Sequence, residues 1–284
     1  MHIDLNTIYS IIENQFPEYK DLKIKKVILN GHDNQTFHLG NEFSLRFPSH
    51  INYSSQVIKE HTFCSELQKQ IPIQITQPIA LGHPSDQYPY HFSINKWIEG
   101  EIVNDNNILD KHQFALDLAN FLINLQKCNV SNGPEPGLHN FYRGGNLAVY
   151  HDETLKAIDN QILFDKSKCL AMWMLGINSR YNQSPVWIHG DIAKGNLLVK
   201  DGKLVAVIDF GNMAIGDPSC DYGMAWTYFD HKSRPIFINS LQLDKGTINR
   251  ARAWALWKAL ITLHDPKHQV DATDTLVELF KEEL

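Results

Sequence analysis

The sequence HGDIAKGNLLVKDGKLVAVIDFGN, residues 189–212, decides the fold of this chain. Two short apolar runs flank the polar residues 200–203, and an Asp-Gly pair between β-rich runs is a strong signal for a β-hairpin. A hairpin brings its two ends together. We therefore expect Asp191 and Asn196, which precede the hairpin, to lie close to Asp209, which follows it.

Two carboxylates and one amide at such a place suit the metal-assisted transfer of a phosphoryl group. One Asp can accept the proton of an attacking hydroxyl, while the other Asp and the Asn hold Mg²⁺ against the phosphates of a nucleotide. Hard oxygen ligands of this kind suit Mg²⁺. A metal-dependent hydrolase could also use clustered Asp, Asn and His side chains, but it would not require the hairpin between them.

The chain before this region is rich in predicted strands. Its first residues form an amphipathic helical pattern, and GHDN and GN turns separate three runs that read as an antiparallel meander. A helix is predicted over residues 55–70 and two more strands follow it. The predicted strands are 24–29, 36–39, 43–47, 78–81 and 91–98. After Gly100 the pattern becomes mostly helical, with the clearest periods at 109–127 and 250–264.

Composition places the chain among ordinary globular proteins. Its 284 residues are 43% hydrophobic and 20% charged, which argues against disorder, and the length predicts about two structural units. No apolar run is long enough to cross a membrane. The net charge of −6 comes without a Lys/Arg block, so nucleic acid is not an expected partner. Four scattered cysteines without a CxxC pair favour free thiols and a cytoplasmic location.

These motifs resemble those of the aminoglycoside phosphotransferase-like small-molecule kinases, a family with the protein-kinase-like fold. His189, Gly190, Asp191 and Asn196 fit the catalytic loop of that family, and Asp209 fits its metal-binding aspartate. The sequence GDPSCD at 216–221 fits the element that usually follows, and KWIEGE, ALDLANFLINLQ and HNFYRGGNL extend the similarity upstream. The resemblance implies a bilobal α+β fold with an antiparallel N-terminal lobe at 1–97 and a larger, mainly helical lobe at 98–284.

The resemblance also assigns expected roles. Asp191 would be the catalytic base, and Asn196 and Asp209 would bind Mg²⁺. Arg46 stands where protein kinases carry a phosphate-binding lysine, with Glu60 as its ion-pair partner; Arg keeps the charge but changes the geometry. An ordinary salt bridge between a strand and a helix is the alternative for this pair. The remaining nucleotide-binding candidates are Gly31, His32, Asp33 and Asn34 in the loop over the phosphates, and Lys96 C=O and Ile98 N–H at the hinge.

The activity that follows is transfer of the γ-phosphoryl group of ATP or GTP to a hydroxyl of a small molecule. The resemblance names an aminoglycoside as the first acceptor and antibiotic resistance as the role, and the stretch 204–230, which has no Lys or Arg, is compatible with a cationic acceptor. Macrolides, amino alcohols, sugars and other metabolites remain open as acceptors. A nucleotide-binding pseudokinase is a further alternative, and the chain is expected to be a monomer or a homodimer.

Some conspicuous residues are expected to have structural roles. His189 should orient the catalytic loop, Asp221 should brace it by hydrogen bonds, and Asp217 should cap a turn before Pro218. Trp226 or Tyr228 could line the acceptor pocket, although core packing is the simpler role for the tryptophans. The segment 143–145, Arg-Gly-Gly, fits either a phosphate-binding nest or a connection between helices.

Overall fold

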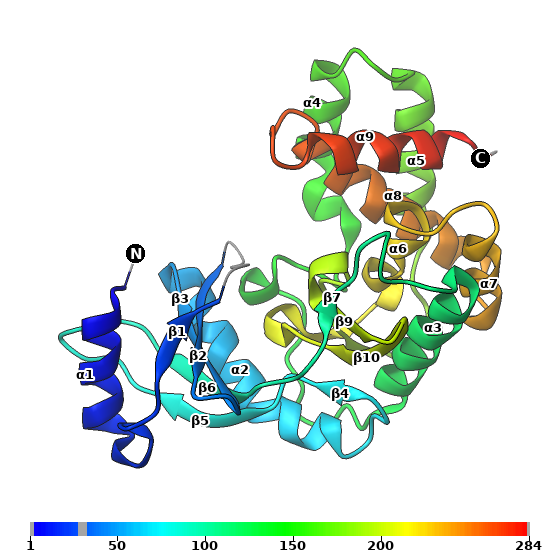
Figure 1. The fold of residues 1–284 in the computed structure, drawn as a ribbon. Coiled ribbons are helices and arrows are strands. Elements are labelled where there is room, and N and C mark those ends of the chain that lie inside the picture. Colours follow the sequence, from blue (N-terminus) through cyan, green and yellow to red (C-terminus); the bar gives the residue numbers. More distant parts are fainter. Residues whose placement is uncertain (1–2, 28–32, 283–284) are drawn as a thin grey trace.

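The computed structural model describes residues 3–27 and 33–282. The N-terminal part is built on a β-sheet and the C-terminal part is mainly helical, as Figure 1 shows. The two parts lie side by side, and the chain passes between them after residue 96.

Five strands form the N-terminal sheet, in the order β1-β2-β3-β6-β5 with all neighbours antiparallel. Its first three strands are the meander predicted from the sequence. The strands are β1 (Ile24–Lys26), β2 (Asn34–Leu39), β3 (Phe43–Pro48), β5 (Pro78–Gly82) and β6 (Phe92–Lys96). Residues 28 and 29 of the first predicted strand lie outside the described residues.

A helix covers each face of this sheet. Helix α1 (Leu5–Gln15) buries Ile8, Ile11 and Ile12 against the apolar side chains of β2, β3 and β6, as its helical spacing predicts. Helix α2 (Ile51–Gln68) lies on the opposite side, toward the C-terminal part (Figure 1). It carries Glu60 to the side of β3 on which Arg46 lies.

A second sheet connects the two parts, in the order β4-β10-β9-β7. It contains the predicted hairpin of β9 (Leu197–Lys200) and β10 (Lys203–Val207), flanked by β7 (Glu101–Ile102) and β4 (Gln74–Ile75). Strand β4 comes from the N-terminal half of the chain and pairs with β10 in parallel. Strands β8 (Val186–Ile188) and β11 (Ala214–Gly216) form a separate antiparallel pair beside this sheet.

Helices make up the remainder of the C-terminal part. Asp110, Asp165 and Asp244 each accept backbone N–H groups at the start of a helix, which accounts for part of the acid excess. The helices are α3 (Lys111–Lys127), α4 (His151–Asn160), α5 (Lys166–Asn178), α6 (Met224–Thr227), α7 (Ser233–Ser240), α8 (Lys245–Thr262) and α9 (Gln269–Phe280).

The largest hydrophobic core lies among these helices. Trp173, Trp226 and Phe237 are buried in it, and α8 packs against α5 and α9. Within the part of the chain that the structure describes, no helix combines the length and apolarity that a membrane span needs. The antiparallel N-terminal sheet and the helical C-terminal part confirm the predicted α+β fold.

Candidate active site

The predicted hairpin joins the candidate residues. Asp201 and Gly202 turn between β9 and β10 with φ of 52° and 75°, the left-handed backbone that a two-residue hairpin loop requires. At the open end of the hairpin, Ile208 donates its N–H to the Asn196 carbonyl over 2.9 Å. This hydrogen bond places Asn196 beside the residue that precedes Asp209.

Asn196 is also tied to Asp191. Its Nδ2 donates to the backbone oxygen of Asp191 over 2.9 Å and to Oδ2 of the same residue over 3.2 Å. Because the amide nitrogen is used in this way, the amide oxygen is the atom of Asn196 that can ligate a cation. The structure thus brings Asp191, Asn196 and Asp209 to one end of the hairpin.

Asp221 and His189 hold the backbone of this loop, as the sequence predicts. The Asp221 carboxylate accepts the N–H groups of His189 and Gly190, each over 2.7 Å. Asp191 N–H points to His189 Nδ1 at 3.2 Å, so the other ring nitrogen, Nε2, carries the proton and donates to the Ile208 carbonyl over 3.0 Å. The imidazole therefore links the loop to the end of β10.

Arg46 connects two carboxylates from different elements. Its Nη1 lies 2.9 Å from Glu60 Oε2 on α2, and its Nη2 lies 2.8 Å from Asp209 Oδ1. The ion pair expected between Arg46 and Glu60 is present, and the contact with Asp209 was not predicted. Guanidinium is planar and always charged, so it can bridge two carboxylates in this way, whereas the single ammonium of a lysine has a different geometry.

The contacts of Arg46 with Glu60 and Asp209 affect the pKa values of these two acids differently. Burial would raise the pKa of Asp209, but the charge of Arg46 and its hydrogen bond outweigh this effect and hold the pKa below its ordinary value. Burial raises the pKa of Glu60, and Arg46 offsets this increase only in part. Asp209 is therefore the more strongly ionised of the two, as a metal ligand needs to be.

Asp209 has an unusual backbone. Its φ of 66° is left-handed, a conformation that non-glycine residues rarely adopt, and its N–H donates to Thr76 Oγ1 over 3.0 Å. Thr76 directly follows β4. The strand that crosses from the N-terminal half of the chain thus helps to fix the candidate metal ligand.

Asp191 is exposed, and its environment disfavours ionisation. Burial of part of the carboxylate raises its pKa, and the nearby negative charge of Asp209 raises it further. His189, Arg143 and Lys258 act in the opposite direction. A carboxylate with a raised pKa is a better proton acceptor than an ordinary aspartate.

The other described nucleotide-binding candidates lie at strands β2 and β6 and on the segment that follows β6. Asp33 and Asn34 lie at the start of β2, and Lys96 ends β6. Ile98 is buried against Leu198 of β9. The candidates Gly31 and His32 lie outside the described residues.

Potential metal ligands are few. In the described ranges, no group of three or more His, Cys, Asp or Glu side chains is arranged to hold a metal ion. Two protein oxygens, from Asn196 and Asp209, suit Mg²⁺, since this ion usually keeps several waters and takes its remaining ligands from substrate phosphates. These residues therefore fit Mg²⁺ better than a transition metal.

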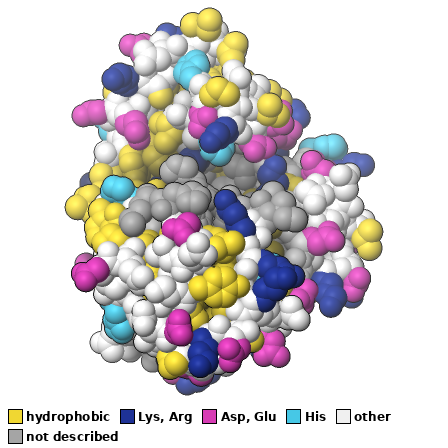
Figure 2. All heavy atoms as spheres, turned by 60° about the vertical axis from the view of Figure 1, so that its left-hand side comes forward, with side chains coloured by type: hydrophobic (Ala, Val, Ile, Leu, Met, Phe, Trp, Pro, Cys, Tyr) yellow, Lys and Arg dark blue, Asp and Glu magenta, His cyan; other side chains and the backbone are white. Residues whose placement is uncertain are grey.

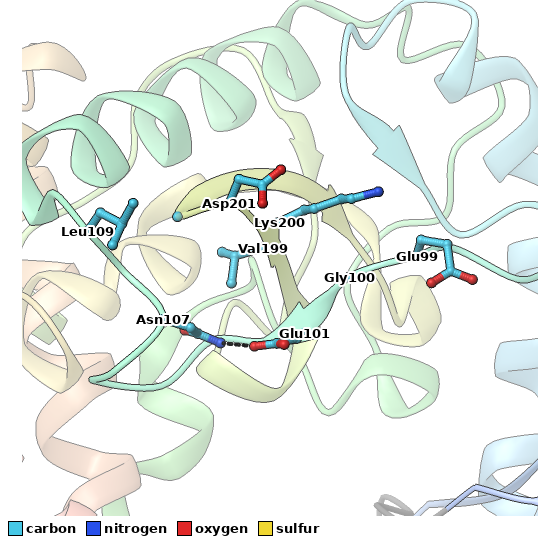
Figure 3. A pocket seen from close by; sticks show the side chains of 9 residues that line it. Glu99, Gly100, Glu101, Asn107, Leu109, Val199, Lys200 and Asp201 are labelled. Carbon is cyan, nitrogen blue, oxygen red and sulfur yellow. Dashed lines mark hydrogen bonds between the residues drawn. The ribbon is translucent and has the colours of Figure 1, made fainter.

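A pocket of about 430 Å³ lies at the far end of the hairpin. Figure 3 shows Asn107 and Glu101, joined by a hydrogen bond of 3.4 Å, on the opposite side of the pocket from Asp201. It contains none of the predicted site residues.

Several contacts around the site have no signal in the sequence. Thr76 beneath Asp209 is one of them. Another is the buried ion pair between Arg250 on α8 and Asp217, with 2.7 Å between Nε and Oδ2, although Asp217 also caps its turn as predicted. Trp226 is fully packed in the core, the simpler role expected for the tryptophans, which leaves Tyr228 of the two residues considered for the acceptor pocket. The ring of Tyr228 lies under Lys111.

Comparisons with known proteins agree with this architecture. A model of the phosphotransferase enzyme family, APH, matches residues 26–260. No curated protein sequence gives a significant match.

Three solved structures illustrate the similarity. The GDP complex of an aminoglycoside 2′-phosphotransferase of type IIIa is 21% identical, with a TM-score of 0.75 and coverage of 98% of this chain and 97% of the other. The streptomycin–ATP ternary complex of APH(2″)-IIa is 18% identical, with a TM-score of 0.62 and coverage of 100% and 98%. The macrolide 2′-phosphotransferase from Brachybacterium faecium is 13% identical, with a TM-score of 0.64 and coverage of 99% and 100%.

Proposed function

Because the chain belongs to the phosphotransferase enzyme family, we propose that it transfers the γ-phosphoryl group of ATP or GTP to a hydroxyl of a small molecule. The observation that carries this proposal is the meeting of Asp191, Asn196 and Asp209 at one end of the β9–β10 hairpin. Phosphoryl transfer needs positioned groups and charge neutralisation more than it needs covalent chemistry, and this set supplies both.

Asp191 is the proposed base. The hydroxyl oxygen of the acceptor attacks the γ-phosphorus, and the bond from phosphorus to the β,γ-bridging oxygen breaks. The nucleoside diphosphate leaves with the electron pair of that bond, and the hydroxyl proton passes to the carboxylate of Asp191. The exposure of Asp191 and its raised pKa support this role.

Asn196 Oδ1 and the Asp209 carboxylate would hold Mg²⁺. The ion would neutralise the charge of the nucleotide phosphates when it is bound. Arg46 orients Asp209 by its 2.8 Å contact, and Glu60 in turn holds Arg46. Arg46 therefore serves the metal ligand directly, besides its proposed contribution to binding phosphate.

The N-terminal part would bind the nucleotide. We assign the phosphates to the loop 31–34, and the base to Lys96 C=O and Ile98 N–H. Ile98 is buried against Leu198, which belongs to β9 of the second sheet. This contact supports a position for the nucleotide's base between the two parts. GDP, ADP and ATP occupy solved relatives, so both ATP and GTP are candidate donors.

The proposal also covers the lobe boundary, the cellular location, the oligomeric state and the acceptor. We place the lobe boundary between residues 97 and 98, and the enzyme in the cytoplasm, where nucleoside triphosphates are abundant and where four unpaired cysteines are expected. We expect a monomer or homodimer without nucleic acid or membrane partners. Aminoglycosides and macrolides, named in the solved relatives, are the first acceptors to test, with a role in resistance if they are phosphorylated.

The test is a screen of hydroxyl compounds for stimulated, Mg²⁺-dependent consumption of ATP and GTP, followed by identification of the phosphorylated product. Removal of Mg²⁺ by EDTA should abolish turnover, and restored Mg²⁺ should recover it. If neither nucleotide raises the melting temperature of the protein in the presence of Mg²⁺, the proposal is wrong at its first step.

A further inference from the structure

Two basic side chains of the C-terminal part lie near the proposed base. Asn140 Nδ2 donates to the carbonyl oxygens of Arg143 and Asn212, and Asn212 packs directly on Gly190, which precedes Asp191. Arg143 lies in the segment between residues 140 and 147, and Lys258 lies on α8; both are close enough to Asp191 to lower its pKa. Neither forms an ion pair with a carboxylate in the described part of the chain. Figure 2 looks onto the N-terminal side and shows Lys and Arg side chains near the boundary between the two parts.

Arg143 is fixed in place by aromatic rings. Its guanidinium carbon lies 5.1 Å from the ring centre of Trp254 and 4.7 Å from that of Trp257, and Tyr150 stacks on Trp257 at 4.1 Å. Gly144 packs directly on Ile188, where a Cβ atom would come within 2.5 Å. These contacts hold the Arg143 guanidinium and the backbone beside it in place.

Two buried hydrogen-bond donors at this place have no partner. Arg143 Nη1 and Trp254 Nε1 are both buried and unpaired, and Trp254 is only 4% exposed. Guanidinium and indole nitrogens can donate but cannot accept, so the two cannot satisfy each other. An unpaired buried donor is costly, and oxygen atoms of a ligand would remove that cost for both.

Acidic groups also act on these two cations. Although Lys258 is exposed, partial desolvation of its ammonium group and the charge of Arg143 lower its pKa, whereas Asp191, Asp33 and Glu153 act in the opposite direction. Glu153 already accepts a hydrogen bond from Trp257 Nε1 over 2.7 Å.

The aspartates of the stretch 204–230, which could have attracted a cationic acceptor, have partners inside the protein. Asp209 binds Arg46, Asp217 binds Arg250, and Asp221 holds the catalytic loop. Asp230 accepts the N–H of Ser233 at the start of α7. These four aspartates are therefore engaged within the protein, whereas Arg143 and Lys258 form no ion pair among the described residues.

We propose that the acceptor carries an anionic group, a carboxylate or a phosphate ester, in addition to the hydroxyl that is phosphorylated, and that Arg143 and Lys258 bind this group with help from Trp254 Nε1. The proposal rests on the proposed phosphotransferase function and narrows its acceptor. It disfavours a polycationic aminoglycoside as acceptor, because the positive charges of Arg143 and Lys258 beside Asp191 would repel it. The anionic group itself does not react.

A direct test uses simple anions as probes. Sulfate represents a phosphate ester and malonate a carboxylate, and each is titrated at constant ionic strength against the protein with Mg²⁺ and a non-hydrolysable ATP analogue, with tryptophan fluorescence as the readout. The better bound probe identifies the type of anionic group. Arg143→Gln and Lys258→Gln should each weaken binding of that probe at least about tenfold, since each removes a charge-assisted hydrogen bond. Arg143→Lys should restore part of the affinity.

Matched controls separate this effect from general charge and from folding. Arg180→Gln, an exposed arginine after α5, and Lys245→Gln, at the start of α8, should leave binding within about twofold of wild type. Lys258 is exposed, so its variant should fold normally even if the Arg143 variants do not. Equal binding by wild type and Lys258→Gln, or no anion binding by wild type, overturns the proposal.

The anion site could instead belong to the transferred phosphoryl group. In that case sulfate should bind the ADP complex but not the complex with the ATP analogue, whose γ-phosphate fills the position, and the proposal would be wrong. We expect the sulfate affinities of the two complexes to agree within about threefold.

Turnover distinguishes failure of this inference from failure of the proposed function. A panel pairs neutral D-glucose with gluconate and glucose 6-phosphate, and includes kanamycin. Rapid phosphorylation of kanamycin that is insensitive to Arg143→Gln would refute the anionic acceptor while leaving the phosphotransferase function intact. Absence of Mg²⁺-nucleotide binding would contradict the function itself, whatever the anion titration shows.

Discussion

Asp191 is the residue on which the proposed chemistry depends most directly. Asp191→Asn should lower kcat by about 10²–10⁴-fold, because the amide cannot accept the hydroxyl proton. Nucleotide affinity should stay within about threefold, since Asn196 and Asp209 are unchanged. Steady-state kinetics and a nucleotide titration measure the two effects. Asp201→Asn, at the far tip of the same hairpin, is the matched control and should keep full activity; an active Asp191→Asn enzyme would show that another group takes the proton.

Asp217 and Arg250 form a buried ion pair, with side chains 8% and 7% exposed. Asp217→Asn should lower the free energy of unfolding by about 3–5 kcal/mol, because it leaves the Arg250 charge buried without a counter-charge. Urea denaturation measures this change. The double variant Asp217→Leu, Arg250→Met removes both charges and should be more stable than the single variant. The reverse order would mean that the loss comes from the cap at Asp217 and not from the stranded charge.

Sequence reasoning at the residue level worked where a recognised motif fixes the surroundings of a residue, and failed where no motif relates the two partners. His189 and Asp221 act on the catalytic loop as expected, because the loop motif fixes their surroundings. The contacts of Thr76 with Asp209 and of Arg250 with Asp217 join residues that no local pattern relates. The roles of Asp191, Asn196 and Asp209 in catalysis and metal binding stay predictions, although their meeting is now a structural fact.

At the scale of elements, the turn at Gly190 limits how the proposed catalytic loop can be altered. Gly190 has φ of 81°, and a Cβ atom there would lie 2.3 Å from the backbone oxygen of Asn212. Gly190→Ala should therefore destabilise the protein by about 1–3 kcal/mol and reduce kcat by displacing Asp191. Thermal unfolding and kinetics test this expectation. Gly195→Ala is the control, because nothing lies within 4 Å of its added methyl group. Similar behaviour of the two variants would contradict the role given to the turn.

The elements predicted from the sequence are those with a regular pattern or a turn signal. The meander and the hairpin have turn signals, the long helices have a helical period, and the structure contains all of them. Strands β4, β7, β8 and β11 have two or three residues each, too few for a period to be seen. They exist because a distant strand pairs with them, so only the tertiary structure reveals them.

At the scale of the whole molecule, Lys59 joins the N-terminal part to the C-terminal part. Its Nζ lies 2.8 Å from His139 Nδ1, and burial lowers the pKa of Lys59 to about 7. The unfolded chain keeps this lysine protonated to near its ordinary value of 10.5. Between these values the unfolded state binds more protons, so this residue makes stability rise with pH.

Lys59→Met should therefore raise the melting temperature at pH 6 and lose this advantage progressively toward pH 9. The expected gain at pH 6 is about 2–4 °C for each kcal/mol of charge burial that is relieved. Thermal unfolding of both proteins across this pH range gives the difference directly. Lys69→Met, at the exposed end of the same helix, should show no such trend. A constant difference for Lys59→Met would mean that the lysine is not forced toward neutrality by its surroundings.

The pairing of β4 with β10 has a consequence for how the protein is made. Thr76 leaves the ribosome early, but its partner Asp209 lies 133 residues further along the chain. At about 5–20 residues per second, synthesis of that interval takes on the order of ten seconds. During this time the segment around β4 has no strand to join, and the backbone of Asp209 cannot be set. The candidate metal ligand thus cannot reach its final geometry until β10 has been made, and a ribosome that pauses before residue 207 holds an N-terminal sheet without a site.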